Sequence, residues 1–397
     1  MTTATQVITP VKDRIAAVAQ ELRDLAPATD AAGKLPDEVV ELLRSTGVTR
    51  MALARELGGY ESGLDEFCEA VMDIAALNPS AGWVAGVVGV HPWELSQVNP
   101  KLQQEIWGED PDVWTASPYM PSGRATRVEG GFRFSGRWSF SSGTDACDWV
   151  TIGGIIVDED GKPEPGPNWY HFVLPRNDYE IVEGSWNVVG LKGTGSKDLI
   201  VEDVFVPDYR VINNEDLDAG RLTEQYAPDK PIYNLVFGTV FSYAIASATI
   251  GICDGALNEF VEFTRDKVGG FGGRAAANPF QQAAYAEGVA EIEASKLQVL
   301  DGARRMMAIV DSGRKLTRSE RLYFRTIQVR SSRRALNAIE KLYTYAGGSA
   351  IRLEQPIQRY WRDAHAAANH MCNIAESIYT NYSLDVYGLE HDQKLFY

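Results

Sequence analysis

The chain has 397 residues, of which 45% are hydrophobic and 23% charged, and its formal net charge is -16 at pH 7. This composition is typical of a globular protein with a substantial core, and the length allows two or three domains. Because an acidic surface repels polyanions, we expect neither a nucleic acid nor an anionic membrane as a partner.

Cysteine spacing and the N-terminal segment bear on the cellular compartment. No CxxC or zinc-like spacing relates the four cysteines, which are Cys68, Cys147, Cys253 and Cys372. We therefore expect reduced, mostly buried thiols and no metal site. Residues 1–13 lack the basic start and apolar core of a signal peptide, and the longest apolar run, residues 81–90, is too short to span a bilayer. The sequence predicts a cytoplasmic protein.

The first hundred residues have a helical pattern. Apolar residues recur at intervals of three and four from Val11 to about Trp107, and Pro36 stands where one helix would begin. This pattern predicts an all-helical N-terminal domain over residues 1–112.

The pattern changes between residues 113 and 210. Short β-branched and aromatic runs, such as residues 131–134 and 199–206, alternate with turns rich in Gly, Asp and Pro. We expect a β-sandwich or barrel here. The following segment, residues 211–232, is polar and contains prolines, which indicates a linker or excursion.

Helical periodicity returns from residue 233 to residue 397. We expect four long helices, at residues 235–267, 280–312, 317–346 and 355–387, packed as a bundle. If the last of these is helical throughout, His365 and His370 point in different directions, so they are unsuited to ligate one metal. The predicted fold class is α+β.

Three motifs, in this order, carry a resemblance to a known family. They are residues 136–143 (GRWSFSSG), residues 190–196 (GLKGTGS) with the strand ending at residue 207, and Gly347-Gly348 followed by Arg362-Asp363-Ala364. Together with the α, β, α order they resemble the acyl-CoA dehydrogenase family over nearly the full length. The resemblance implies a central β-sandwich or barrel between a helical domain and a four-helix bundle, and a homotetramer formed through the bundle.

The resemblance also implies a flavin site. Ser and Gly backbone in residues 140–143 can approach a planar ring edge-on, and residues 193–196 can form a concavity of N–H groups. Simple hairpin turns are the alternative for both segments. The residues expected at the flavin are Trp138, Phe140, Ser141, Ser142, Gly143, Trp186, Thr194, Ser196, Arg265, Gly347 and Gly348, with the last three acting across a subunit boundary.

The expected dehydrogenase base is missing. In most of that family a Glu follows the Arg-Asp-Ala motif by seven residues, where this chain has Met371, and the second family position lies within residues 231–253, which contain no Asp or Glu. His370 stands beside the first position. This substitution resembles the two-component (group D) flavin-dependent monooxygenases built on the same fold: the oxygenase components of 4-hydroxyphenylacetate, secosteroid-phenol and dibenzothiophene monooxygenases.

That resemblance implies an oxygenase that receives reduced flavin, as FMN or FAD, from a separate NAD(P)H:flavin reductase. With O2 the reduced flavin would form a C4a-hydroperoxyflavin that hydroxylates a small aromatic, phenolic substrate. A histidine can hold a proton for the peroxide or take one from a phenol. His370 is the first candidate for that base and His91 the second, and Ser142 can hydrogen-bond flavin N5 or the peroxide.

Other interpretations remain open at this stage. They are N- or S-oxygenation on the same fold, an acyl-CoA dehydrogenase with a displaced base, for which Glu376 is the only nearby acid, and a helical scaffold that has lost flavin. His91 can also be a helix-ending residue, Ser142 a turn cap and Trp186 a core residue. His171, His365 and His391 are expected to be structural or at the surface.

Overall fold

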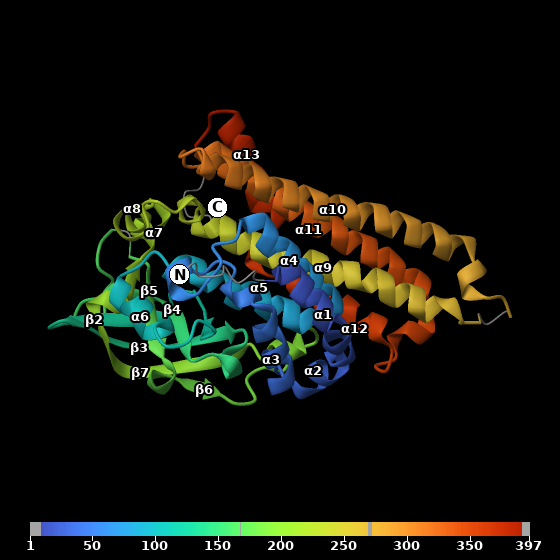
Figure 1. Ribbon diagram of the computed structural model, residues 1–397, viewed down its shortest axis with the longest axis horizontal. Helices are drawn as coiled ribbons and strands as arrows, with labels where there is room; N and C mark the ends of the chain where they lie inside the picture. Colours follow the sequence, from blue (N-terminus) through green and yellow to red (C-terminus); the bar gives the residue numbers. More distant parts are fainter. Residues whose placement is uncertain (1–8, 167, 269–271, 391–397) are drawn as a thin grey trace, which may run out of the picture.

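The computed structural model describes residues 9–166, 168–268 and 272–390. The β-sheet lies at one end of an elongated molecule, and the long C-terminal helices extend away from it toward the other end (Figure 1). The expected order of helices, strands and helices is confirmed. His391, residues 1–8 and most of the glycine-rich segment 269–273 lie outside the described residues.

From residue 9 onward, six α-helices form the N-terminal part: α1 (Val11–Asp24), α2 (Ala26–Ala32), α3 (Asp37–Thr46), α4 (Leu64–Leu77), α5 (Pro79–Leu95) and α6 (Pro100–Trp107). Helix α5 is buried along its entire length, and Asn78 caps it by accepting a hydrogen bond from the backbone N–H of Ala81. The helix continues through Pro92 to Leu95, so the alternative in which His91 ends a helix is wrong.

The central part is one sheet of eight strands: β1 (Thr115–Ala116), β2 (Gly123–Val128), β3 (Gly131–Ser141), β4 (Trp149–Val157), β5 (Tyr170–Pro175), β6 (Glu180–Val182), β7 (Lys197–Pro207) and β8 (Val211–Asn213). Its order is β6-β7-β3-β2-β4-β5-β8, with β1 paired to β4. Two register shifts interrupt the β3–β7 pairing. Such irregularities bend a strand, and the second, between Trp138 and Ser141, lies in the expected flavin segment.

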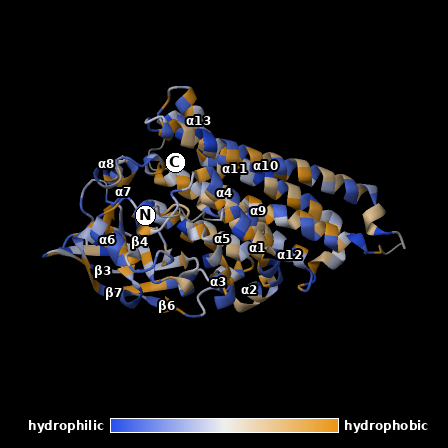
Figure 2. Ribbon diagram, viewed as in Figure 1, coloured by the Kyte–Doolittle hydropathy of each residue, from blue (hydrophilic) through white to orange (hydrophobic). Residues whose placement is uncertain are grey.

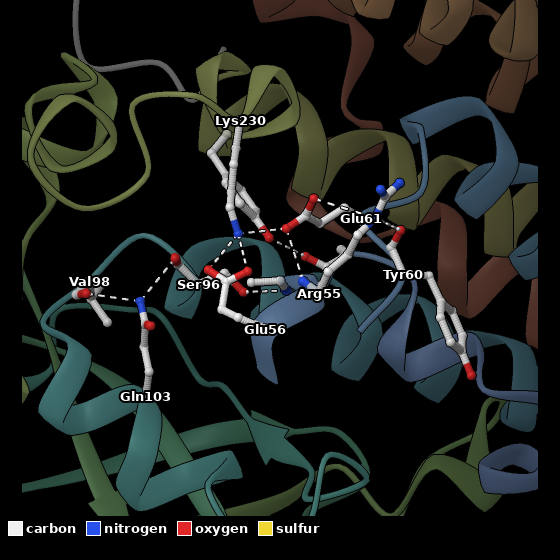
Figure 3. A network of polar contacts seen from close by, with 11 residues as sticks. Arg55, Glu56, Tyr60, Glu61, Ser96, Val98, Gln103 and Lys230 are labelled. Carbon is white, nitrogen blue, oxygen red and sulfur yellow. Dashed lines mark hydrogen bonds and ion pairs between the residues drawn. The ribbon is translucent and has the colours of Figure 1, made fainter. Parts of the chain in front are cut away.

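The segment after the sheet is an ordered excursion. Strand β8 pairs with β5, and two short helices follow, α7 (Asn214–Asp218) and α8 (Arg221–Tyr226). Lys230 pairs with Glu56 and with Glu61, whose Oε1 is 2.6 Å from Lys230 Nζ (Figure 3). The Trp93 indole N–H also donates to Ile232 O at 2.8 Å. These contacts fix the excursion against the N-terminal helices.

In the described residues of the C-terminal part there are five α-helices rather than four: α9 (Phe237–Arg265), α10 (Pro279–Asp311), α11 (Arg318–Ala346), α12 (Pro356–Ala368) and α13 (Ala375–Val386). The prediction of one helix over 355–387 is wrong because the chain leaves the helix at residues 369–374. His370 therefore stands outside α12, at the start of a 3-10 turn that begins at Met371. The directions expected for His365 and His370 on one helix do not apply.

Helix α9 is the central helix of the molecule. It is long and apolar enough to cross a membrane by length and composition alone, but 94% of its most apolar window is buried within the protein. Helices α4, α5, α11 and α12 pack around it. By contrast, α10 carries both hydrophilic and hydrophobic residues along its length (Figure 2). Helix α9 thus joins the N-terminal helices and the bundle in one core.

The close packing of α4 and α5 gives a test of this core. A Cβ atom added at Gly82 would lie 2.2 Å from the Ala75 Cα, whereas one added at Gly273 would meet nothing within 4 Å. We expect Gly82→Ala to lower the free energy of unfolding by about 1–3 kcal/mol, because two buried helices must separate. Urea unfolding measures this, with Gly273→Ala as the control. Equal stability of both variants would contradict the packing.

Candidate active site

A chain of hydroxyl groups connects the two flavin motifs. Ser142 Oγ accepts a hydrogen bond from the Trp83 indole N–H at 3.2 Å and lies 2.7 Å from Ser196 Oγ, which is 2.7 Å from Thr194 Oγ1. The Thr194 hydroxyl donates to Leu191 O at 2.8 Å. Since each hydroxyl has one hydrogen, the donors run from Trp83 through Ser142 and Ser196 to Thr194. Ser142 is left with acceptor capacity.

The backbone of both motifs is held in an unusual conformation. Phe140 and Leu191 have positive φ angles of 68° and 54°, a conformation that costs a non-glycine residue about 1–2 kcal/mol. The Phe140 side chain is 71% exposed and meets Trp186 edge-on, with ring centroids 5.9 Å apart. The Trp186 indole N–H donates to Leu191 O at 3.2 Å. Strain of this kind concentrates at functional sites.

Gly143 and Trp138 have different roles in the first motif. Gly143 has φ of 72°, and a Cβ there would lie 2.8 Å from Val84 Cγ1 of α5, so only glycine fits. Trp138 is buried inside the sheet, where its indole N–H donates to Gly153 O at 2.8 Å. Trp138 therefore supports the strand from within.

The Arg-Asp-Ala motif holds the second flavin motif in place. The Asp363 carboxylate accepts a hydrogen bond from Leu191 N at 2.6 Å, and Arg362 donates to Val189 O. Burial raises the pKa of Asp363 to about 7, while the hydrogen bond from Leu191 acts against this rise. Two motifs far apart in sequence thus form one structural unit.

These residues fit a flavin ring. An exposed phenylalanine offers an apolar face, and the Ser142 hydroxyl has acceptor capacity beside it. Ser141 Oγ is buried and has no hydrogen-bond partner among the described residues. A flat heteroaromatic ring with polar edges can use all three groups.

His370 is held in one tautomer. Its Nδ1 accepts a hydrogen bond from Cys372 N at 3.2 Å, so the neutral ring must carry its hydrogen on Nε2. Burial and the nearby Arg325 charge lower its pKa to about 4, which keeps the ring neutral near pH 7. Arg325 donates to Cys372 O at 3.2 Å and so holds the turn. His370 Nε2 is a hydrogen-bond donor.

His91 is held in the opposite tautomer. Its Nδ1 lies 2.7 Å from the Tyr119 hydroxyl, which donates to Glu94 Oε2 at 2.8 Å. Because the single Tyr119 hydrogen is used in this way, His91 Nδ1 must donate to Tyr119. His91 Nε2, 2.9 Å from Ser117 Oγ, is then an acceptor. Burial, followed by the charge of His171, lowers the pKa of His91 to about 3.

A cluster of aromatic rings joins the two histidines. Phe241 of α9 lies 5.7 Å from His370 and 5.5 Å from Tyr119, centroid to centroid. Trp83, which donates to Ser142, lies 5.7 Å from His370. The structure therefore brings His370, His91 and Ser142 around one aromatic cluster.

Three of the expected flavin residues lie elsewhere. Gly347 and Gly348, just after α11, line a cavity of about 650 Å³ with Lys267 and Arg274. Helix α11 runs away from the sheet (Figure 1). Arg265 is exposed there and pairs with Glu262. Within one chain these residues do not meet the Ser142 region.

The remaining candidates are structural or lie at the surface. His365 pairs with Glu340 at 2.5 Å on the outside of the bundle. Glu376, the acid considered for a displaced dehydrogenase base, is exposed and lies 3.6 Å from Arg333. His171 is fully buried against Glu94. All four cysteines are buried and form no disulfide.

Sequence reasoning gave no role to Ser117 and did not single out Trp83, Glu94 or Tyr119. A signal for Glu94 was present, because it follows His91 by three residues on one buried helix and so shares its face. Tyr119 and Ser117 come from the segment between β1 and β2, where no periodic pattern marks them.

The fold and the flavin motifs define an acyl-CoA dehydrogenase-like flavoprotein. The family model described as "Acyl-CoA dehydrogenase, C-terminal domain" matches residues 243–374. A pigment production hydroxylase of Rhodococcus erythropolis is 42% identical over 380 residues, covering 96% of this chain and 97% of that protein. The oxygenase subunit HsaA of a flavin-dependent monooxygenase from Rhodococcus jostii is 35% identical and covers 95% and 98% of the two chains.

Solved structures point to the same family as these relatives. The crystal structure of 3-HSA hydroxylase from Rhodococcus sp. RHA1 superposes with a TM-score of 0.89 at 34% identity, covering 97% of this chain and 98% of that one. The chain belongs to the flavin-dependent monooxygenases built on the acyl-CoA dehydrogenase fold. The predicted enzyme class and flavin cofactor are thereby confirmed.

The two neutral histidines predict how stability depends on pH. Their pKa values of about 3 and about 4 lie below the ordinary value of 6.5, so on acidification the unfolded chain binds protons first. We expect the free energy of unfolding to fall as the pH drops from about 6.5 to about 4, by at most about 1.4 kcal/mol per pH unit for each histidine.

Urea unfolding across this pH range measures the effect. His370→Gln should flatten the slope, because the variant has no imidazole to keep neutral. An unchanged slope in His370→Gln would contradict the neutral, partly buried state of this ring.

Proposed function

We propose that the protein is the oxygenase component of a two-component hydroxylase. It takes reduced flavin from a separate NAD(P)H:flavin reductase and uses O2 to hydroxylate a small aromatic, phenolic molecule. The observation that carries this proposal is the opposite hydrogen-bond polarity of two histidines on one aromatic cluster: His91 Nε2 accepts and His370 Nε2 donates.

His91 is the group suited to a phenol. A phenol is a better nucleophile when a base takes its hydroxyl hydrogen, and His91 Nε2 is an acceptor whose present partner is the Ser117 hydroxyl. While Ser117 donates its one hydrogen to His91 Nε2, its oxygen can accept a hydrogen bond from the phenol hydroxyl. We therefore assign the role of base to His91, in place of His370, which is the first candidate from sequence. Burial lowers the pKa of His91, and the negative charge of a phenolate beside Nε2 would raise it again, because an adjacent anion favours the imidazolium.

His370 is the group suited to hold a proton near the flavin. Its Nε2 hydrogen lies in a partly buried setting beside Trp83 and Phe241, which restricts water. A neutral donor in such a setting can hydrogen-bond an oxygen without releasing its proton. His370 thus acts as donor and His91 as acceptor.

Ser142 fits the reduced form of the cofactor. Its hydrogen is directed to Ser196, so it can only accept from a further partner. Reduced flavin carries a hydrogen on N5 that oxidised flavin lacks, and Ser142 can accept it. When bound, reduced flavin would supply the electrons that activate O2 for oxygen transfer. Phe140, Ser141, Gly143, Trp186, Thr194 and Ser196 would form the wall against its ring.

The partners follow from the same proposal. Helix α10 exposes the apolar side chains of Tyr285, Val289 and Leu297, which are suited to contact between copies of the chain. A homotetramer would let Arg265, Gly347 and Gly348 of one copy serve the flavin of another. The reductase is required because the sequence shows no strand-linked GxGxxG motif for NAD(P)H. We place the protein in the cytoplasm.

A product assay tests the proposed function. We expect the chain, supplied with FMN or FAD, a flavin reductase, NADH and O2, to add one oxygen atom to phenols in a panel that also contains indoles and thiophenes. Mass spectrometry identifies the products. Oxygenation of indoles or thiophenes with no phenol product would instead support N- or S-oxygenation. Bleaching of bound oxidised flavin by an acyl-CoA under anaerobic conditions would support a dehydrogenase.

The two histidine roles are separable by substitution. We expect His91→Gln to slow hydroxylation by about 100-fold or more, since glutamine retains a hydrogen bond but cannot take the proton. His370→Gln should instead lower the ratio of hydroxylated product to hydrogen peroxide, because the donor near the flavin is changed. Oxygen consumption and peroxide assays distinguish these effects, with His365→Gln as the control. The same defect in both variants would contradict separate roles.

A further inference from the structure

A buried chain of polar side chains extends from His91 across the junction of the helices and the sheet. Glu94 of α5 lies 2.5 Å from His171 Nδ1 of β5 through Oε1 and accepts from the Tyr119 hydroxyl through Oε2 at 2.8 Å. Asn214 of α7 approaches His171 Nε2 at 2.9 Å. Glu94, His171 and His91 are each fully buried. The role of His91 as an acceptor does not by itself require so long a chain.

The Glu94 carboxylate at the centre of this chain sets the direction of the hydrogen bonds that involve His171, Tyr119 and His91. An ionised carboxylate has no hydrogen, so it accepts from both His171 Nδ1 and the Tyr119 hydroxyl. Tyr119 has one hydrogen, and burial together with the Glu94 charge raises its pKa well above the ordinary value, so the hydroxyl stays protonated. Its oxygen must then accept from His91 Nδ1.

We propose that Glu94, acting through Tyr119, is the positioning residue that makes His91 Nε2 a proton acceptor. The carboxylate places the hydrogen of His91 on Nδ1 and provides the negative charge that offsets the imidazolium formed when His91 takes a substrate proton. The proton moves from the phenol oxygen to His91 Nε2, and His91 retains its Nδ1 hydrogen. This inference rests on the proposed phenol chemistry of His91.

The substitution Glu94→Gln removes the side-chain charge and changes the direction of its hydrogen bonds, while the shape of the side chain stays nearly the same. A glutamine that accepts from His171 through its oxygen presents its amide N–H2 to Tyr119, so the tyrosine hydroxyl must turn its hydrogen toward His91 Nδ1. His91 then carries its hydrogen on Nε2 and becomes a donor. A nearly isosteric change at Glu94 thus turns His91 Nε2 from a hydrogen-bond acceptor into a donor, although His91 itself is unchanged.

The substitution His171→Gln is the matched control. It replaces the imidazole that contacts Glu94 and weakens this contact between α5 and β5. The glutamine amide can still donate a hydrogen bond to the carboxylate. The hydrogen bond from His91 Nδ1 to the Tyr119 hydroxyl keeps its direction. If the effect of Glu94→Gln came from loosened packing, His171→Gln would reproduce it. Tyr119→Phe removes only the connecting hydroxyl and keeps the ring among Phe237, Phe241 and His171.

The probe is 4-nitrophenol, whose phenolate has a visible absorption band that the neutral phenol lacks. We mix it with the full-length chain at a pH below the pKa of the free probe, with and without FAD, and subtract the FAD spectrum. The wild type should show the phenolate band on binding, and His171→Gln should show a band at least as strong, because it removes the His171 charge that lowers the pKa of His91. Glu94→Gln should bind the probe without that band, and Tyr119→Phe should show a weaker band than the wild type. Circular dichroism verifies that each variant is folded.

The outcomes separate this inference from the proposed function. A phenolate band in Glu94→Gln as strong as in the wild type would overturn the role of Glu94 and leave the phenol site intact. Loss of the band in His171→Gln as well would also overturn it, because packing would then explain both results. If the wild type itself binds no 4-nitrophenol, or binds it only as the neutral phenol, the phenol chemistry of His91 fails and the inference fails with it. If Glu94→Gln does not fold, the phenolate band of Tyr119→Phe is the test. A band as strong as that of the wild type would overturn the inference.

Discussion

The buried carboxylate of Glu94 constrains how the N-terminal helical layer and the sheet of this protein meet. A fully buried charge is tolerated only when hydrogen bonds compensate its lost hydration, and removing one partner from such a group typically costs a few kcal/mol. Glu94 belongs to α5, and its partners His171 and Tyr119 come from β5 and from the segment before β2. The helical layer and the sheet must therefore dock in one arrangement for the carboxylate to be satisfied. That arrangement also sets where His91 lies.

A second constraint acts on the other side of the cluster. The Arg-Asp-Ala motif, which in the dehydrogenases precedes the base, serves here to anchor the second flavin motif through Asp363 and Leu191. The chain then leaves α12 and forms a tight turn that Arg325 holds through Cys372 O. His370 is therefore presented by a turn, with its Nδ1 occupied. A residue that simply replaced a helical glutamate would have kept both ring nitrogens available to solvent or substrate.

Much of the fold follows from sequence periodicity, and the exceptions have identifiable causes. The helical and strand segments were predictable because their apolar residues follow helical or alternating patterns. The break after Ala368 was not, because the alanines before it favour a helix and the turn is fixed by distant partners, including Arg325 and the Thr249 hydroxyl that accepts from Asn373. Contacts of this kind override local propensity.

The candidate site also has features that the sequence could predict and features that it could not. Ser142, Thr194 and Ser196 were predictable because short backbone motifs with glycine mark them, and the structure connects them through hydroxyl hydrogen bonds. The tautomers of His91 and His370 were not predictable, since each depends on a hydrogen-bond partner that only the folded chain supplies. The direction of those bonds, and not the presence of two histidines, separates an acceptor from a donor. Two imidazoles in one aromatic cluster would otherwise be interchangeable, and each is fixed by a different part of the fold: Glu94 in the helical layer for His91, and the turn after α12 for His370.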